Sequence, residues 1–184
     1  MNTGKIIFLN GASSSGKSTI AALLQQRLEE PFLHMSLDAF IGMLPRVNDE
    51  LVLKMAPGFH RSIAAMAQTG NNVIVDHVLV ADEWLSECVS LLTGYVLFVG
   101  LRCPLAELER REVGRDQRRQ GFARSQFEVA HRGKIYDVEL DTAALPPEDC
   151  VRSIMRFYSD AEPRALQRMR ESLRIGQQAP GTRR

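Results

Sequence analysis

The sequence predicts an α/β fold in which a parallel sheet of five strands is covered by helices on both faces. Short apolar runs of strand length alternate along the chain with stretches of helical periodicity. The strand-length runs are continuously apolar, as in strands that are buried on both faces. The length of 184 residues suits one domain, and 45% hydrophobic residues are enough to build a packed core.

The first predicted element is a strand over Lys5–Asn10, which runs directly into a glycine-rich loop. Residues 11–18 read G-A-S-S-S-G-K-S, the complete G-x-x-x-x-G-K-S pattern. Ile20, Leu24 and Leu28 then recur at helical spacing, so the loop joins a strand to a helix. Glycines let such a loop curl its backbone N–H groups around a phosphate. The pattern therefore predicts nucleotide binding by Gly11, Ala12, Ser13, Ser14, Ser15, Gly16, Lys17, Ser18 and Thr19.

Two side chains at the end of this loop carry specific expectations. Lys17 is predicted to reach the β- and γ-phosphates, and the Ser18 hydroxyl to be a ligand of Mg²⁺. ATP and Mg²⁺ are the expected cofactors. GTP stays open as the nucleotide, because such loops read phosphates and the chain carries no evident motif that reads the base.

The second predicted strand covers residues 31–37, and Asp38 follows at its carboxyl end. Ligands of open α/β sheets gather at that edge. We therefore predict that Asp38 acts as a catalytic base, which accepts the proton of an acceptor hydroxyl as it attacks the γ-phosphate. The alternative reading is a helix N-cap before Ala39, and the two roles are compatible.

Residues 39–59 are rich in bulky apolar side chains, yet Pro45, Pro57 and Gly58 interrupt them. We interpret this segment as an acceptor-binding insertion, and a core-packing loop is the alternative. Its basic residues are Arg46 and Lys54, which are too few to grip a phosphorylated acceptor. An uncharged, partly apolar acceptor fits better. The residues predicted to contact the acceptor are Asp38, Phe40, Met43, Leu44, Val52 and Met55.

A helix over Ser62–Gln68 and a strand over Asn72–Asp76 follow. The strand is apolar until it ends at Asp76, which is the form of a Walker B element. An acid at that position orients Mg²⁺ or its bound water. Asp76 is therefore the second predicted metal ligand, beside Ser18.

The rest of the chain continues the alternation of helices and strands. The predicted elements are a helix over Ala81–Leu92, a strand over Tyr95–Gly100, a helix from about Pro104, a strand over Ile135–Leu140, and helices over Pro146–Tyr158 and Arg164–Ile175. The tail Gly176–Arg184 is expected to be disordered. We predict a main domain over residues 1–158, followed by a C-terminal helix and an arginine-rich tail over residues 159–184.

Five arginines fall within residues 110–119, and glycines bracket them. We interpret residues 110–122 as an arginine-rich lid that closes on the transferring phosphoryl group. The alternative is a solvated helix face with i,i+4 ion pairs. A nucleic-acid patch is disfavoured, because residues 109–121 also carry Glu109, Glu112 and Asp116 and contain no aromatic residue.

Charge and composition exclude several classes of protein. The formal net charge is +1, from 23 Lys and Arg against 22 Asp and Glu, which disfavours a dedicated binder of nucleic acid or anionic membrane. No stretch reaches the roughly 18 apolar residues of a membrane span, and we expect a cytoplasmic protein without a membrane partner. The three cysteines are widely spaced and predict no metal site.

Five blocks, taken in order, give the chain a family resemblance. They are I-I-F-L-N-G-A-S-S-S-G-K-S, S-L-D-A-F-I-G-M-L-P, N-V-I-V-D-H-V, L-R-C-P-L-A-E-L-E-R-R-E-V-G-R and Y-D-V-E-L-D-T, spread from about Lys5 to Phe157. The chain resembles the chloramphenicol phosphotransferase family of P-loop kinases. The resemblance implies ATP-dependent phosphorylation of a hydroxyl on a small molecule, by a fold like that of adenylate and shikimate kinases.

The resemblance also assigns residues and shows two departures. Asp38 matches the family's catalytic aspartate, and Lys17 and Ser18 match its phosphate and Mg²⁺ positions. The lid arginines of the pattern R-E-x-x-R-x-x-R fall on Arg111, Arg115 and Arg118. A second acid of the family is replaced here by His77, and the family's R-G-D-R reads R-D-Q-R.

We therefore predict a phosphotransferase that acts on a small-molecule hydroxyl, with chloramphenicol, a similar antibiotic or a metabolite as the acceptor. A nucleoside, nucleotide or sugar-nucleotide kinase is the alternative within enzymes. A nucleotide-dependent switch or ATPase, which would bind a macromolecule through the arginine-rich tail, is the alternative outside them. The sequence carries no signal of the oligomeric state.

Overall fold

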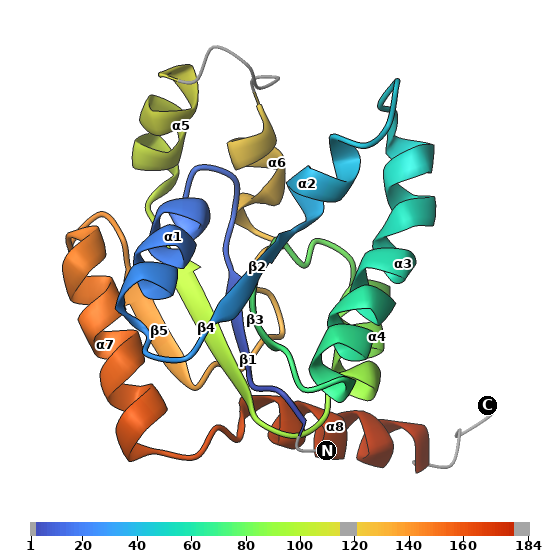
Figure 1. The fold of residues 1–184 in the computed structure, drawn as a ribbon. Coiled ribbons are helices and arrows are strands. Elements are labelled where there is room, and N and C mark those ends of the chain that lie inside the picture. The colour runs from blue at the N-terminus through green and yellow to red at the C-terminus, as the bar shows by residue number, and fades with distance from the viewer. Residues whose placement is uncertain (1–2, 115–120, 179–184) are drawn as a thin grey trace.

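Five parallel strands form one sheet with helices on both faces, as Figure 1 shows, and this confirms the predicted fold class. The structure is a computed structural model that describes residues 3–114 and 121–178, with side chains described through residue 174. The strands are β1 (Ile6–Asn10), β2 (Phe32–Ser36), β3 (Asn72–His77), β4 (Val96–Arg102) and β5 (Val138–Asp141). Their order in the sheet is β2-β3-β1-β4-β5, and every neighbouring pair is parallel.

Helices connect the strands and cover them. They are α1 (Lys17–Arg27), α2 (Leu37–Ile41), α3 (Asp49–Gln68), α4 (Asp82–Leu91), α5 (Leu105–Val113), α6 (Phe122–Phe127), α7 (Pro147–Asp160) and α8 (Ala165–Gln178). In Figure 1, α1 and α7 cover one face of the sheet, and α3, α4 and α8 cover the other. None of the helices in the described ranges is long and apolar enough to cross a membrane.

Successive residues of the three inner strands, β1, β3 and β4, belong to two separate cores. In β1, Ile6 and Phe8 belong to the core under α3, α4 and α8, whereas Ile7 and Leu9 belong to the core under α1 and α7. This follows from the two-residue period of a strand. All four side chains are fully buried, which explains why the run is continuously apolar.

The helix predicted over Ser62–Gln68 begins much earlier, at Asp49, and the expectation that Pro57 and Gly58 interrupt the segment is wrong. Asn48 caps the helix, because its side chain accepts a hydrogen bond of 2.8 Å from the N–H of Leu51. Pro57 removes one hydrogen bond of the ladder. Buried side chains on both sides of the proline, including Ala56, Phe59 and Ile63, offset this loss.

Two further boundaries differ from the predictions by three residues. β5 begins at Val138 rather than Ile135, because the Asp137 carboxylate, not a strand backbone, accepts the bond of 2.9 Å from the N–H of Phe98. The last helix continues to Gln178, so residues 176–178 of the predicted tail are helical. The rest of the tail, residues 179–184, lies outside the described residues.

The carboxyl ends of the strands share one edge of the sheet. α2, α5 and α6 lie at this end of the molecule in Figure 1, and α8 lies at the opposite end. The glycine-rich loop follows β1, the central strand, at the same edge. Ligands of such sheets bind at this edge.

Candidate functional site

The glycine-rich loop has a backbone that only certain residues can adopt. Ser14 and Gly16 have φ angles of 66° and 90°, in the left-handed region, which curls the chain before α1 begins. Gly11 has no room for a side chain, because a Cβ there would lie 2.6 Å from both the carbonyl oxygen of Leu101 and the hydroxyl oxygen of Ser15. The local sequence therefore folds as the pattern predicts, with the loop closed against the end of β4.

Polar groups of the loop fit the phosphates of a nucleotide. The hydroxyl groups of Ser14 and Ser15 are buried and have no hydrogen-bond partner among residues 3–114 and 121–178. Buried polar atoms normally have a partner, so two such hydroxyls in one loop suit a ligand with several acceptor oxygens. The N-terminus of α1 begins at Lys17 and adds the N–H groups of its first turn.

Lys17 places its ammonium group inside this loop. Its Nζ donates hydrogen bonds of 2.9 Å and 3.0 Å to the carbonyl oxygens of Gly11 and Ala12. It also lies 3.9 Å from Oδ1 of Asp76, and both side chains are more than 90% buried. The positive charge is thus held between the loop and the end of β3, within reach of a phosphate chain in the loop.

Ser18 and Asp76, the two predicted metal ligands, are in direct contact. The Ser18 hydroxyl donates a hydrogen bond of 2.6 Å to Oδ2 of Asp76. Burial raises the pKa of Asp76, but the His34 imidazole, the Lys17 charge and the Ser18 hydroxyl together lower the pKa below its usual value. An ionised carboxylate beside a hydroxyl offers the oxygen ligands that Mg²⁺ prefers. The residues present therefore fit this ion.

His34 is a member of this group that sequence reasoning missed. Its Nε2 lies 3.7 Å from Oδ2 of Asp76. The two side chains share a face of the sheet, because β2 and β3 pair with Ser36 opposite Asp76 and His34 lies two residues before Ser36. The alternation along β2 could have placed His34 on this face, but only the strand order shows that β3 is its neighbour.

Asp38 lies in the first turn of α2, at the same edge of the sheet, and its residue is exposed. The alternative reading of Asp38 as the helix N-cap is wrong, since Ser36 takes that role. The Ser36 hydroxyl accepts a hydrogen bond of 3.1 Å from the N–H of Ala39. Because Ser36 pairs with Asp76 in the sheet, Asp38 follows β2 directly beside the end of β3.

The apolar residues predicted to contact the acceptor differ in how far they are buried. Phe40 on α2 and Val52 and Met55 on α3 are half-buried and pack against the core. Leu44 is half-buried as well, whereas the Met43 residue is 74% exposed. The structure therefore brings Phe40, Val52 and Met55 to one core and leaves Met43 on the surface.

The three predicted lid arginines are only partly covered by the structure. Arg111 on α5 donates to Glu107 over 2.7 Å and to the carbonyl oxygen of Thr142 over 2.8 Å, which fixes its side chain between α5 and the end of β5. Arg115 and Arg118 lie outside the described residues. The lid prediction thus stays an expectation for that part of the chain.

α6, which no sequence pattern predicted, contacts the glycine-rich loop. The side-chain oxygen of Gln126 accepts a hydrogen bond of 2.8 Å from the N–H of Ser13. The N-terminus of α6 is in turn tied to α5, because the buried Glu112 carboxylate accepts bonds of 2.9 Å from the N–H groups of Gly121 and Ala123. These contacts join the two ends of the segment that contains the undescribed residues 115–120.

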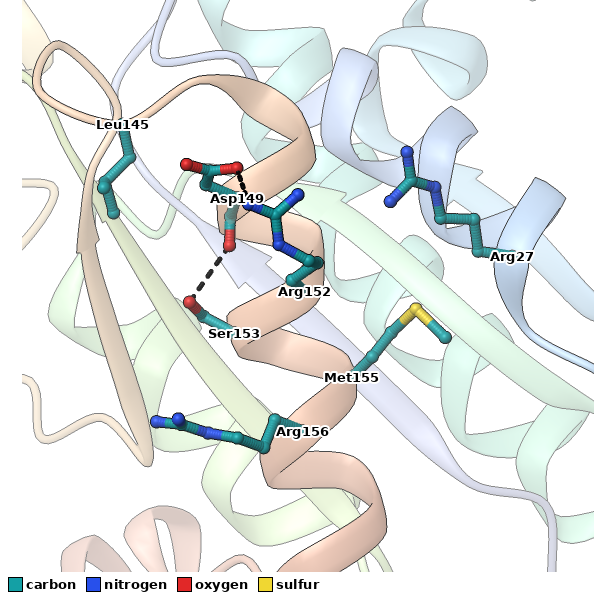
Figure 2. A pocket seen from close by; sticks show the side chains of 7 residues that line it. All are labelled: Arg27, Leu145, Asp149, Arg152, Ser153, Met155 and Arg156. Carbon is teal, nitrogen blue, oxygen red and sulfur yellow. Dashed lines mark hydrogen bonds and ion pairs between the residues drawn. The ribbon is translucent and has the colours of Figure 1, made fainter.

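Two hollows open on the surface of the described residues. One, of about 600 Å³, lies beside the glycine-rich loop, where Ala12 and Ser15 face the end of β4, α5 and Asp141. The other, of about 880 Å³, lies over α1 and α7, with Arg27, Arg152 and Arg156 in its lining (Figure 2). Because its lining contains no predicted site residue, only the first hollow extends the site.

Comparison with known proteins gives one family. The family described as "Chloramphenicol phosphotransferase-like protein" matches residues 4–159. A curated protein of Mycobacterium tuberculosis (strain ATCC 25618 / H37Rv), named "Putative O-phosphotransferase Rv2636", is 32% identical over 202 aligned positions. The match covers 93% of this chain and 90% of that protein.

Solved structures, among them those of two P-loop kinases, share the fold. The APS kinase CysC of Mycobacterium tuberculosis, in complex with AMPPNP and APS, has a TM-score of 0.69 at 17% identity and covers 87% of this chain and 100% of its own. A gluconokinase from Sinorhizobium meliloti 1021 has a TM-score of 0.61 at 19% identity. The match covers 96% of this chain and 99% of the gluconokinase. The tunicamycin resistance protein of Deinococcus radiodurans has a TM-score of 0.64 at 19% identity. The match covers 87% of this chain and 98% of that protein.

Proposed function

The chain belongs to the chloramphenicol phosphotransferase-like family, and from this premise we propose that it transfers the γ-phosphoryl group of ATP to a hydroxyl group of a small molecule. The observation that supports the proposal is a grouping at one edge of the sheet. Lys17 in the glycine-rich loop, the Ser18–Asp76 pair and Asp38 all lie where β1, β2 and β3 end. These are the parts that phosphoryl transfer requires.

Each of these groups has a separate task in the proposed reaction. Lys17 and the loop N–H groups bind and orient the phosphates, and stabilise the negative charge that spreads over the transferring phosphoryl oxygens. Ser18 and Asp76 would hold Mg²⁺, which supplies further charge neutralisation at the phosphates when bound. Asp38 accepts the proton of the acceptor hydroxyl as the oxygen attacks the γ-phosphorus. Of the predicted lid arginines, Arg111 donates a hydrogen bond to the carbonyl oxygen of Thr142, the residue that follows β5.

The acceptor that we propose is uncharged and partly apolar, such as chloramphenicol, a similar antibiotic or a metabolite with a hydroxyl group. Phe40 lies two residues after Asp38 and is half-buried, and Val52 and Met55 pack against the same core as Phe40. Arg46 and Lys54 are the basic residues of residues 39–59. A phosphorylated acceptor would need a stronger cluster of guanidinium groups than this segment supplies.

The proposal is tested by incubating the purified protein with Mg²⁺ and either ATP or GTP. The acceptor panel contains chloramphenicol, other hydroxyl-bearing antibiotics, nucleosides and sugars. Mass spectrometry then detects the gain of one phosphoryl group, and we expect it on chloramphenicol or on another uncharged panel member. Nucleotide hydrolysis that depends on a macromolecule, with no phosphorylated compound, would instead favour a nucleotide-dependent switch.

The role of Asp38 has its own test. Asp38→Asn keeps the size of the side chain but removes the base, so we expect kcat to fall by about 100-fold or more. Calorimetry should show unchanged nucleotide affinity, because Asp38 lies outside the glycine-rich loop. Asp160→Asn, which changes an exposed acid at the end of α7, is the matched control and should keep normal turnover. Loss of nucleotide binding in Asp38→Asn would contradict the base role.

A further inference from the structure

Three side chains on three different elements form a hydrogen-bonded chain beside the proposed site. Oε2 of Glu87, on α4, lies 2.8 Å from Nδ1 of His60, on α3. Nε2 of His60 lies 3.1 Å from Nε2 of His77, the last residue of β3. Both histidines are fully enclosed, with exposed fractions of 0% and 1%. The hydrogen-bonded chain thus runs from Glu87, a partly exposed acid, to His77, the residue that follows Asp76.

Counting donors and acceptors assigns the protons of this chain. Glu87 is a carboxylate and can only accept, so Nδ1–H of His60 donates to it. Both rings are fully buried, where the uncharged form is favoured, and an uncharged imidazole has one N–H donor and one acceptor nitrogen. Nε2 of His60 therefore accepts, and Nε2–H of His77 donates. Nδ1 of His77 is then an acceptor, and it finds no partner within the described part of the chain.

The unpartnered Nδ1 shows that packing alone does not account for a histidine at position 77. Its ring stacks on Trp84 at a centroid distance of 5.4 Å and meets Phe59 edge-on at 5.4 Å. A phenylalanine would fill the same aromatic surroundings without leaving a buried polar atom unsatisfied. What a phenylalanine could not supply is the hydrogen bond from Nε2 to His60.

His60 holds α3 at a position where the helix is weak. Pro57 has no N–H to donate to the carbonyl group of the preceding turn, and Gly58 follows it. Before Pro57, residues 49, 50, 53 and 54 of α3 are exposed and Val52 and Met55 are half-buried, whereas Phe59 and His60 are fully buried. His60 is therefore a firmly held residue directly after the weak point.

The residues of the proposed acceptor site lie on the other side of this weak point. We call residues 37–59 the acceptor arm, which consists of α2 and the first half of α3. Its two parts meet where Phe40 packs edge-on against Phe59, at a centroid distance of 5.0 Å. Phe59 is adjacent to His60 in the chain. The bond between His60 and His77 thus joins the base of the acceptor arm to β3.

We propose that the Glu87–His60–His77 chain positions the acceptor arm against the end of β3, and so sets the acceptor relative to Asp38 and the phosphates. The inference rests on the proposed function, because it takes residues 37–59 as the acceptor site. The three side chains are positioning residues. They fix the backbone on which the acceptor binds, and the acceptor itself need not touch them.

The first test measures the arm without any acceptor, by hydrogen–deuterium exchange on the whole protein. His77→Phe keeps an aromatic ring in place and removes the bond to His60. We expect amide exchange to accelerate in residues 37–56 by about tenfold, the equivalent of one lost hydrogen bond, with no change in α1. Unchanged exchange in residues 37–56, or equal acceleration throughout the protein, would overturn the proposal.

A pair of variants at Glu87 separates the hydrogen bond from simple packing. Glu87→Gln retains a side-chain oxygen that accepts from His60, and should behave as the original protein does. Glu87→Leu removes the acceptor, and should accelerate exchange in residues 37–56 as His77→Phe does. Glu83→Gln, an exposed change on the same helix, is the control. The same behaviour of Glu87→Gln and Glu87→Leu would overturn the proposal.

The second test is kinetic and uses chloramphenicol, or whichever panel compound is phosphorylated. We expect His77→Phe and Glu87→Leu to raise the KM for the acceptor about tenfold, with a smaller change in kcat and an unchanged Kd for the nucleotide. An unchanged acceptor KM, or an equal loss of nucleotide affinity, would overturn the positioning role. If no compound is phosphorylated, the proposed function fails. The exchange experiment still decides whether the Glu87–His60–His77 hydrogen bonds hold the acceptor arm in place.

Discussion

Single positions in the glycine-rich loop determine whether the loop can keep its shape against the end of β4. A Cβ on Gly11 would meet the backbone carbonyl of Leu101 at 2.6 Å, and a backbone group cannot turn away as a side-chain tip can. Gly11→Ala must therefore displace the loop from the end of β4. We expect the Kd for the nucleotide to rise by roughly tenfold or more, measured by calorimetry.

A second glycine substitution provides the control for this prediction. A Cβ on Gly58 would meet no atom within 4 Å, and the residue lies inside α3, away from the loop. Gly58→Ala should leave the nucleotide Kd unchanged. It should also stabilise the protein by about 0.5–1 kcal/mol, because alanine favours a helix. Equal nucleotide affinity of Gly11→Ala and the original protein would show that the loop tolerates displacement.

The contact between Ser18 and Asp76 leads to a prediction about Mg²⁺. Removal of the hydroxyl in Ser18→Ala takes one of the two proposed ligands and leaves the carboxylate in place. We expect the affinity for ATP in the presence of Mg²⁺ to fall by about tenfold, with little change in EDTA. A loss of the same size in EDTA would show that the hydroxyl binds the phosphates and not the metal.

The residues of the candidate site differ in how far the sequence reveals them. Lys17 and Ser18 follow from a contiguous motif, and Asp38 and Asp76 from their positions at strand ends. The contacts of Gln126 with Ser13 and of His60 with Glu87 join residues that are 113 and 27 positions apart. No local pattern encodes such pairs, because they arise from the packing of one element against another.

Among the elements, α5 and α6 show how a buried acid can join two helices. Each oxygen of Glu112 accepts one N–H of the first turn of α6, at 2.9 Å. Glu112→Ala leaves the N–H groups of Gly121 and Ala123 without this acceptor. We expect a loss of about 1–3 kcal/mol in the free energy of unfolding, measured with urea, and faster amide exchange in α6.

The control for this prediction is an acid on the same helix. Glu109 pairs with Arg124 at 2.8 Å, and both side chains are at least one-third exposed. Such a surface ion pair contributes little, so Glu109→Ala should change the stability by less than about 1 kcal/mol. A similar loss in both variants would mean that Glu112 acts as a surface charge and not as a cap.

α3 shows why element boundaries were harder to predict than element types. Its sequence contains Pro57 and Gly58, which local propensity reads as the end of a helix. The helix continues because apolar side chains before and after Pro57, such as Ala56 and Phe59, are buried in the core beside the sheet. β1 and β3, in contrast, were predicted closely, since a continuously apolar run between loop residues has few alternatives.

At the scale of the whole molecule, the sheet order explains how the site is assembled. β1 lies in the middle of the sheet with β3 on one side, and β2 lies beyond β3. This order brings the glycine-rich loop, Asp76 and Asp38 to one edge from three separate parts of the chain. The order itself could not be read from the sequence, although a parallel sheet with connecting helices could.

The burial of neutral histidines makes the stability of the whole protein depend on pH. Burial lowers the pKa of His131 to about 4, that of His60 below its usual value, and that of His77 well below its usual value. The same side chains titrate near 6.5 in an unfolded chain. Between about pH 4 and 6.5 the unfolded state therefore binds more protons than the folded state, and the free energy of unfolding falls as the pH falls.

Above about pH 5, carboxylates contribute little to this loss. Asp76 and Glu107 have pKa values lowered in the folded protein, so their contribution is lost only as the pH falls through the usual carboxylate range and below it. We expect urea denaturation to give a free energy of unfolding that changes little between about pH 7 and 8. At pH 5 it should be lower by about 2 kcal/mol from His131 alone. His131→Gln should reduce this dependence, and an equal dependence in that variant would assign the loss to other groups.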